Sequence, residues 1–214
     1  MDTPVCYIFG AGEFSTCNIS LTDEDLVIAA DGGYDHLIQI GLRADIALGD
    51  FDSVQSLEIW EDTICEKHTY PPEKDDTDMM LAIKLGLSKG YHTFEIYGGL
   101  GGRLDHSIAN IQALSYLAAE GAQGILHHDQ YVLTVIQNSG FTIPKDFTGY
   151  VSVFSLSDTS QNVTIKGLKY EIEGSTLTNQ FPLGISNEAT GKKGSISVEN
   201  GTLLILWQGE NLTL

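Results

Sequence analysis

The stretch IALGDFDS, residues 46–53, joins a short apolar run to a polar turn that carries two carboxylates. Residues 46–48 are too few for a helix and suit a buried strand. Other apolar runs are similarly short, at three to five residues, and segments with helical spacing separate several of them. The expected strands are residues 5–9, 26–30, 46–48, 94–97, 125–127 and 132–136, and the expected helices are residues 34–40, 77–88 and 106–120.

This alternation of strands and helices predicts a mostly parallel sheet with helices on its faces. After residue 140 the pattern changes to short segments of β-branched or alternating residues without a helical period. These segments are residues 150–156, 163–165, 169–172, 195–198 and 203–207. We therefore predict an α/β fold class, with an α/β domain over residues 1–139 and an all-β sandwich domain over residues 140–214.

Composition and charge limit the classes of function. The chain has 214 residues and a formal net charge of −18, and an acidic protein is poorly suited to nucleic acids and anionic membranes. It would also repel a polyphosphate unless a divalent cation supplied positive charge. No signal peptide is recognisable, and no apolar stretch reaches the ~20 residues of a membrane span. Three widely spaced cysteines suit free thiols. We expect a cytoplasmic protein with no nucleic acid or membrane partner.

Carboxylates follow the expected strand at residues 46–48. Asp50 and Asp52 have i, i+2 spacing there, at a position where open α/β sheets bind ligands. Such carboxylates suit Mg²⁺, which usually keeps positions for water and for phosphate oxygens. Turn chemistry alone would explain a single aspartate, but Asp31, Gly32 and Gly33 end another strand in the same way. Repeated Asp and Gly at strand ends favours metal-assisted chemistry on a phosphate.

A second polar segment begins with a glycine run at residues 98–102. Glycines let a backbone approach phosphates and present N–H groups to them. Arg103 follows directly, and its guanidinium suits bidentate contact with phosphate oxygens. Before the expected helix at residues 77–88, we interpret Asp76 as its cap, while Asp78 suits a cap and a ligand equally. His106 is as compatible with a structural role as with ligand contact.

Together and in this order, four motifs resemble the thiamine pyrophosphokinase (thiamine diphosphokinase) family. They are DGG at residues 31–33, GDFDS at 49–53, KDxTD at 74–78 and GGxGGRxDH at 98–106. The resemblance is specific over residues 31–110. It continues more thinly in the β region, where residues 185–188 and Trp207 resemble the thiamine-contacting segment of the family.

The resemblance implies transfer of the pyrophosphoryl group of Mg²⁺-ATP to the hydroxyl of thiamine, with AMP as the second product. It also implies a homodimer whose active sites lie between the α/β domain of one subunit and the β domain of the other. The implied metal ligands are Asp31, Asp50, Asp52, Asp75 and Asp78. The implied ATP contacts are Asp31, Gly32, Gly33, Ser53, Thr77, Gly99, Gly101, Gly102, Arg103 and His106. The implied catalytic residues are Asp50, Asp52, Asp78, Arg103 and Asp105, and the implied thiamine contacts are Asp105, Ser186, Asn187 and Trp207.

Several alternatives stay open at this point. An aspartate such as Asp78 would accept the proton of the hydroxyl, but the sequence does not choose among the aspartates. Trp207 would either stack on cationic thiamine or belong to the core of the sandwich. One rival function is a phosphohydrolase whose first aspartate forms an aspartyl-phosphate. A second rival is a non-catalytic sensor of thiamine or nucleotide, and a third is a relative that acts on another pyrimidine or thiazole alcohol.

Overall fold

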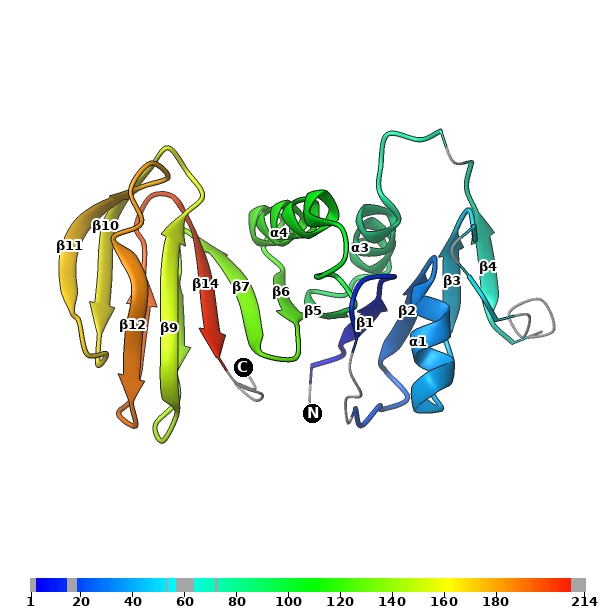
Figure 1. Cartoon of the computed structure of the whole chain (residues 1–214), viewed down its shortest axis with the longest axis horizontal. Coiled ribbons are helices and arrows are strands. Elements are labelled where there is room, and N and C mark those ends of the chain that lie inside the picture. Colours follow the sequence, from blue (N-terminus) through cyan, green and yellow to red (C-terminus); the bar gives the residue numbers. More distant parts are fainter. Residues whose placement is uncertain (1–2, 15–18, 53, 57–63, 72, 209–214) are drawn as a thin grey trace. The chain divides into compact units, whose positions relative to one another are not determined.

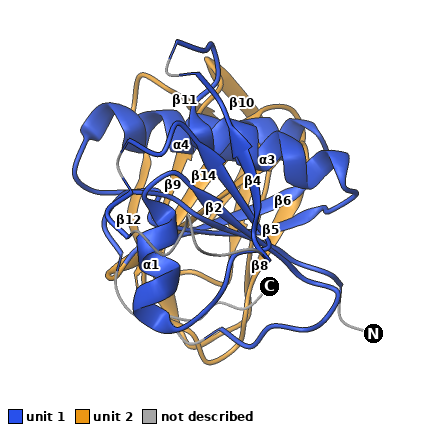
Figure 2. Ribbon diagram, turned by 90° about the vertical axis from the view of Figure 1, so that its right-hand side faces the viewer, with its two compact units in different colours: residues 1–128 blue, residues 129–214 orange. Residues whose placement is uncertain are grey.

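The computed structural model describes residues 3–14, 19–52, 54–56, 64–71 and 73–208. The chain divides into two compact units, Met1–His128 and Asp129–Leu214, which Figure 2 distinguishes by colour. The first contains a parallel sheet with helices, and the second contains only strands among its described residues. The predicted fold class is confirmed.

The sheet of the first unit has the strand order β6-β5-β1-β2-β3-β4 (Figure 1). The neighbouring strands pair in parallel throughout this series. The strands are β1 (Cys6–Phe9), β2 (Leu26–Ala30), β3 (Ile46–Gly49), β4 (Glu66–Thr69), β5 (Thr93–Tyr97) and β6 (Gln123–His127). Because all of them run in one direction, their carboxyl ends meet at one edge of the sheet.

Helices cover both faces of this sheet. They are α1 (Gly33–Ile40), α3 (Asp78–Ser88) and α4 (Leu104–Ala119). Side chains alternate between the faces of a strand, so Phe9 and Val27 lie in a core with Tyr34 and Leu37 of α1. On the other face α3 packs so closely that a Cβ at Gly86 would lie 2.6 Å from the ring of Phe94. The buried runs predicted from the sequence are therefore strands covered on two sides, as parallel sheets require.

The second unit is a β sandwich. Strands β12, β9, β14 and β7 pair antiparallel in that order, and β11, β10, β13 and β8 form a four-stranded sheet. Their bounds are β7 (Tyr131–Gln137), β8 (Gly140–Ile143), β9 (Thr148–Ser155), β10 (Thr159–Lys166), β11 (Ile172–Thr178), β12 (Gly184–Thr190), β13 (Gly194–Ser197) and β14 (Thr202–Gln208). The second unit therefore includes β7, which the predicted boundary after residue 139 assigned to the first domain.

Some strands differ from the sequence prediction. The prediction at residues 169–172 is wrong, because β11 begins only at Ile172 and continues to Thr178. The strands β4, β8 and β12 were not predicted. The reason is clearest in β4, whose sequence EKHT is polar and whose residues are all at least partly exposed. An edge strand of this kind carries little of the apolar signal used to recognise strands.

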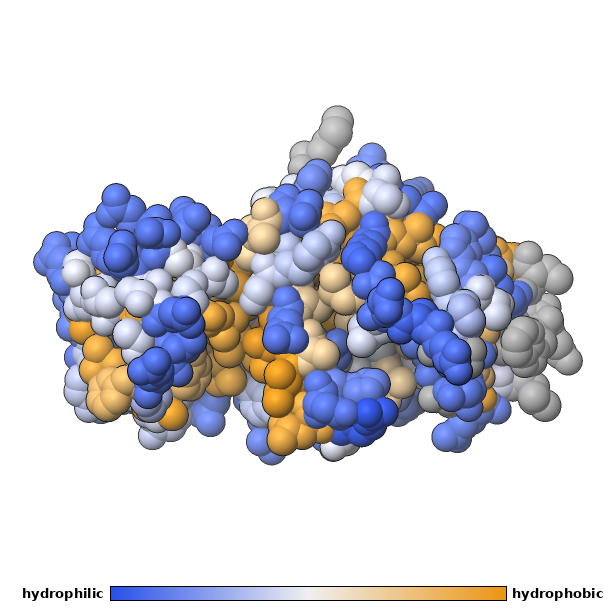
Figure 3. All heavy atoms as spheres, turned by 90° about the horizontal axis from the view of Figure 1, so that it is seen from above, coloured by the Kyte–Doolittle hydropathy of each residue, from blue (hydrophilic) through white to orange (hydrophobic). Residues whose placement is uncertain are grey.

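Hydrophilic residues cover much of the face shown in Figure 3, interspersed with apolar patches. None of the helices in the described ranges has the length and apolar character needed to cross a membrane.

Candidate active site

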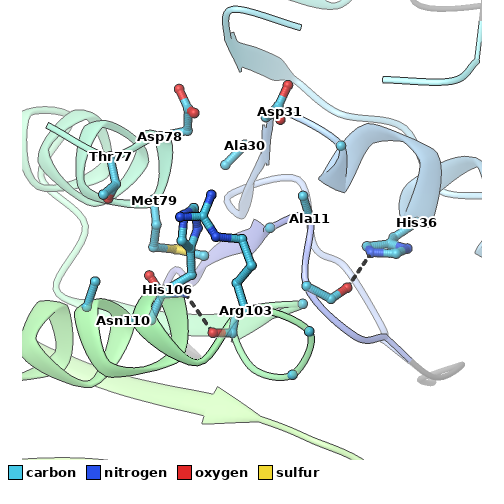
Figure 4. A pocket seen from close by; sticks show the side chains of 18 of the residues that line it. Ala11, Ala30, Asp31, His36, Thr77, Asp78, Met79, Arg103, His106 and Asn110 are labelled. Atoms are coloured by element: carbon cyan, nitrogen blue, oxygen red, sulfur yellow. Dashed lines mark hydrogen bonds between the residues drawn. The ribbon is translucent and has the colours of Figure 1, made fainter. Parts of the chain in front are cut away.

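Segments that follow four parallel strands surround one cavity of about 910 Å³ in the first unit (Figure 4). The turn after β1 supplies residues 10–13, and the turn after β2 supplies Asp31 and Gly32. Asp50 follows β3, and the glycine run follows β5. These strand ends thus meet around one cavity, at the position where open α/β sheets bind ligands.

Three of the predicted metal ligands lie together. One carboxylate oxygen each from Asp31, Asp50 and Asp52 lies within 4.8 Å of the other two. Carboxylate oxygens at this spacing fit a hard divalent cation, which takes oxygen ligands. The donor set therefore suits a magnesium-type ion, and Asp31, Asp50 and Asp52 are the residues that would hold it.

The backbone around these carboxylates has an unusual conformation. Asp31 has φ of +50° and Phe51 has φ of +61°, a region that non-glycine residues rarely adopt. Phe51 is only 8% exposed and packs in the core formed with α1. The backbone N–H of Asp52 donates to Oδ1 of Asp50 at 3.2 Å. A buried aromatic anchor thus places Asp50 and Asp52 on either side of Phe51.

The acidic segment before α3 lies on another wall of the cavity. Asp75, Thr77 and Asp78 line it, and Oδ1 of Asp78 accepts a hydrogen bond from Nζ of Lys74 at 2.7 Å. Asp75 and Asp78 do not belong to the group of three carboxylates described above. The prediction that Asp76 caps α3 is wrong. Thr77 is the N-cap and its Oγ1 accepts from the N–H of Met80, whereas Asp76 pairs with Lys84.

The glycine run is fitted tightly against the turn after β1. Gly98 has φ of +61°, and a Cβ there would lie 2.2 Å from the carbonyl oxygen of Gly10. The N–H of Gly12 donates to the carbonyl of Gly98 at 2.7 Å. Only glycine tolerates this combination of conformation and close approach. Gly99, Gly101 and Gly102, the predicted ATP contacts of this run, line the cavity. Asn110 of α4 donates to the carbonyl of Gly99 at 2.6 Å.

Arg103 lines the cavity and is held by Asp105. Nη2 of Arg103 lies 2.6 Å from Oδ2 of Asp105, and its Nε donates to Oδ1 at 3.2 Å. The hydrogen bond from Arg103 lowers the pKa of the Asp105 carboxyl below its ordinary value. Both side chains are largely exposed. Asp105 therefore contacts Arg103, a candidate phosphate-binding residue, and does not itself line the cavity.

The remaining predicted residues of the first unit have different positions. His106 lines the cavity from α4, next to Arg103 (Figure 4). Gly33 does not line it and has a packing role, because a Cβ there would lie 1.8 Å from the carbonyl oxygen of Phe9. Ser53, predicted to contact ATP, lies outside the described residues.

The predicted thiamine contacts of the second unit are largely buried within it. Trp207 is 0% exposed and its ring lies 5.4 Å from that of Phe141. The side chain of Asn187 accepts from the N–H of Tyr170 at 3.0 Å and donates to its carbonyl at 2.7 Å. Only Ser186 is exposed. The structure thus supports the core alternative for Trp207 and gives Asn187 a backbone-binding role.

Sequence reasoning missed several residues of the cavity. His36 of α1 lines it and forms a hydrogen bond through Nε2 with the carbonyl of Gly12 at 2.9 Å (Figure 4). Glu13 lines it too, and its Oε1 accepts from the N–H of Gly102 at 3.1 Å. Asp35 and Asn110 are further examples. For Asp35 and His36 in the first turn of α1, and for Asn110 in the second turn of α4, the available signal was position beside the predicted motifs.

Comparison with known proteins agrees with this geometry. Residues 18–126 match the thiamin pyrophosphokinase catalytic domain, and residues 140–203 match the thiamin pyrophosphokinase vitamin B1 binding domain. The chain belongs to the thiamin pyrophosphokinase family. The match to the second domain covers most of the sandwich, where the motifs alone gave the weaker resemblance.

Individual thiamine pyrophosphokinases are similar over nearly the whole chain. A thiamine pyrophosphokinase of Bacillus subtilis is 32% identical over 86% of this chain and 88% of its own. A crystal structure of thiamine pyrophosphokinase from Bacillus subtilis has a TM-score of 0.85 at 26% identity, covering 97% of this chain and all of that one. A crystal structure of thiamin pyrophosphokinase from Geobacillus thermodenitrificans has a TM-score of 0.83 at 25% identity, covering 98% of this chain and all of that one. These similarities favour a thiamine pyrophosphokinase over the phosphohydrolase and sensor alternatives.

Proposed function

We propose that the chain transfers the pyrophosphoryl group of Mg²⁺-ATP to the hydroxyl of thiamine, releasing AMP and thiamine diphosphate. The observation that carries the proposal is the meeting of the Asp31, Asp50 and Asp52 carboxylates. Asp31 and Asp50 line a cavity whose other walls bear the glycine run and Arg103. Membership of the thiamin pyrophosphokinase family supplies the substrate class. The phosphate chemistry follows from the donors and charges of the cavity.

The metal site is proposed on Asp31, Asp50 and Asp52, with Asp75 and Asp78 in support. When bound, Mg²⁺ would neutralise charge on the phosphate oxygens of ATP. The three carboxylates hold their oxygens close together before any ligand arrives, because the turn at Phe51 is anchored in the core. Such preorganisation lowers the cost of bringing like charges together when the ion binds.

The glycine loop and Arg103 are proposed to bind the phosphates. Gly101 and Gly102 both have positive φ, and Gly102 is exposed at the cavity. Arg103 offers a planar set of donors suited to phosphate oxygens. Asp105 orients this guanidinium through two hydrogen bonds. Phosphoryl transfer relies on such alignment and charge neutralisation more than on covalent help.

Lys74 and Asp78 are proposed to serve the acceptor side of the reaction. Their ion pair spans 2.7 Å and both side chains are largely buried. In this state the Asp78 carboxylate is compensated, so the acidic cavity carries less excess charge. If the ammonium group of Lys74 moved from Asp78 to a bound phosphate, the Asp78 carboxylate would become available to accept the proton of the thiamine hydroxyl.

We also propose the organisation that the family resemblance implies. The α/β domain, residues 1–139, would bind ATP and metal, and the sandwich, residues 140–214, would bind thiamine. Ser186 is exposed on the second unit and is retained as a candidate thiamine contact. The protein is proposed to be a cytoplasmic homodimer with its active sites between subunits.

Product analysis tests the proposed function. The protein is incubated with Mg²⁺-ATP and thiamine, and the nucleotides and thiamine esters are separated and quantified. We expect one AMP for each thiamine diphosphate. Release of inorganic phosphate without any thiamine ester would favour the phosphohydrolase, and binding of both ligands without product would favour the sensor.

A further inference from the structure

Helix α1 carries a carboxylate that accepts hydrogen bonds from residues 55 and 56, shortly after the proposed metal ligands Asp50 and Asp52. Asp35 lies in the first turn of α1. Its Oδ2 accepts the N–H of Gln55 and its Oδ1 accepts the N–H of Ser56, each at 2.8 Å. Both oxygens are thus occupied by backbone donors. Asp35 lines the cavity and is not part of the group of three carboxylates.

These two bonds complete the support of the segment that holds Asp50 and Asp52. On the near side, the segment leaves β3 and buries Phe51 in the core with Tyr34 and Leu37 of α1. On the far side, Asp35 fixes residues 55 and 56 to the same helix. Asp52 lies between the two attachments, and it is exposed, so burial alone does not fix its position.

Helix α1 is also attached to the third carboxylate. Asp31 precedes the helix by two residues, and the N–H of Tyr34 donates to its carbonyl at 3.2 Å. One short helix therefore contacts both parts of the metal site, Asp31 by chain continuity and Asp52 through Asp35. Hydrogen bonds from backbone N–H groups to a carboxylate are charge-assisted and stronger than neutral ones. The two bonds to Asp35 can therefore fix the distance between Asp31 and the Asp50–Asp52 turn.

We propose that Asp35 is a positioning residue that holds the Asp50–Asp52 turn in register with Asp31 for metal binding. This inference rests on the proposed function only where it assigns the bound ion to the transfer reaction. The positioning of the carboxylates by Asp35 does not depend on which reaction the site performs. Asp35 acts through the N–H groups of Gln55 and Ser56 and does not bind the ion. Groups that orient metal ligands typically change affinity or activity by about 10–100-fold when removed.

The test titrates Mn²⁺ into nucleotide-free protein and measures the free ion by electron paramagnetic resonance. Asp35→Ala should raise the dissociation constant on the order of tenfold. Asp35→Asn should raise it less, because the amide oxygen retains one of the two acceptors. Amide exchange at Gln55 and Ser56 should accelerate in both variants. In the assay with thiamine, the Mg²⁺ concentration that gives half of the maximal rate should rise, while the KM for thiamine stays unchanged.

Asp25 provides a matched control within the same unit. Its carboxylate also accepts backbone N–H groups with both oxygens, from Val5 and Thr22 at 2.8 Å each. It lies at the start of β2, at the opposite end of the strand from Asp31. Asp25→Ala should leave Mn²⁺ affinity unchanged even if it lowers stability, and circular dichroism checks the fold of every variant.

Each outcome decides between specific alternatives. Wild-type Mn²⁺ affinity in Asp35→Ala would overturn the positioning role. Complete loss of Mn²⁺ binding in Asp35→Asn, equal to that in Asp52→Asn, would also overturn it, because it would make Asp35 a ligand. A wild-type protein that binds Mn²⁺ but yields no thiamine diphosphate would overturn the proposed function alone, and the Asp35 comparison would still decide the present inference.

Discussion

At the scale of single residues, the aspartates of the first unit differ in the groups that surround their carboxylates. Asp76 pairs with Lys84 and Asp105 pairs with Arg103, whereas Asp31, Asp50 and Asp52 bring their oxygens together. From the sequence alone, Asp76 was interpreted as a cap, Asp105 as a catalytic and thiamine-binding residue, and Asp31, Asp50 and Asp52 as metal ligands. The basic partners of Asp76 and Asp105 lie 8 and 2 positions away along the chain, and residue spacing alone does not encode the directions of these side chains.

Asp52→Asn tests the metal site directly. The amide keeps the shape of the side chain but removes its charge, so turnover at limiting Mg²⁺ should fall on the order of a hundredfold, the equivalent of a few kcal/mol of lost charge stabilisation. Steady-state assays across a Mg²⁺ series measure this. Asp23→Asn, on the exposed loop before β2, is the control. Near-normal turnover of Asp52→Asn at low Mg²⁺ would refute the assignment.

Arg103 should also control the ionisation of its neighbour. The Arg103 hydrogen bond lowers the pKa of Asp105, so the ion pair persists above that lowered pKa and is lost as pH falls through it. In Arg103→Ala the pKa of Asp105 should rise toward its ordinary value, because the hydrogen bond that lowers it is lost. Carboxyl chemical shifts followed by NMR against pH measure the change. An unaltered titration would mean that the pair does not persist in solution.

Arg103→Lys tests the proposed phosphate contact. Lysine keeps the charge but loses the planar fork of donors, so the KM for ATP should rise by about tenfold, the equivalent of one lost charge-assisted hydrogen bond. The KM for thiamine should change little. Initial rates with each substrate varied in turn give both constants. An unchanged KM for ATP would place Arg103 outside the phosphate site.

At the scale of elements, the site depends on how closely helices and turns approach the strand ends. Strand β3 and the turn after it were predictable, because an apolar run and its acidic turn lie within a few residues. The clamp from Asp35 to Gln55 and Ser56 was not, since it joins residues 20 and 21 positions apart. The polar strand β4 escaped prediction for a different reason, since edge strands need no continuous apolar run.

Gly33→Ala tests the approach of α1 to β1. The added Cβ would lie 1.8 Å from the carbonyl oxygen of Phe9, so α1 or β1 must shift. We expect a loss of about 3 kcal/mol in the free energy of unfolding, at the upper end of overpacking effects. Urea denaturation measures it. Gly140→Ala is the control, since its Cβ would meet no atom closer than 3.5 Å. Equal stability of the two variants would contradict the close approach.

At the scale of the whole molecule, two units of different architecture share one chain, and the family membership joins them in one function. The change from alternating helices and strands to strands alone was visible in the sequence because periodicity records it. The burial of Trp207 was not, since a tryptophan on a strand suits a core and a ligand face equally. Its 0% exposure decides for the core.

Trp207→Ala should therefore destabilise the second unit. Truncating a fully buried tryptophan removes its packing and leaves a cavity, at a cost of about 4 kcal/mol. Urea unfolding followed by circular dichroism should show a lower midpoint, while Mn²⁺ affinity of the folded protein stays unchanged. Unchanged stability with a raised KM for thiamine would instead return Trp207 to a binding surface.

The central claim is that a pyrophosphoryl group, and not a single phosphoryl group, moves to thiamine. Parallel reactions with ATP radiolabelled at the α- or the γ-phosphorus test it most directly. We predict that the γ label appears in thiamine diphosphate and the α label in AMP, in equal amounts and only with thiamine and Mg²⁺ present. An α label recovered in ADP, with the γ label in thiamine monophosphate or free phosphate, would contradict the account.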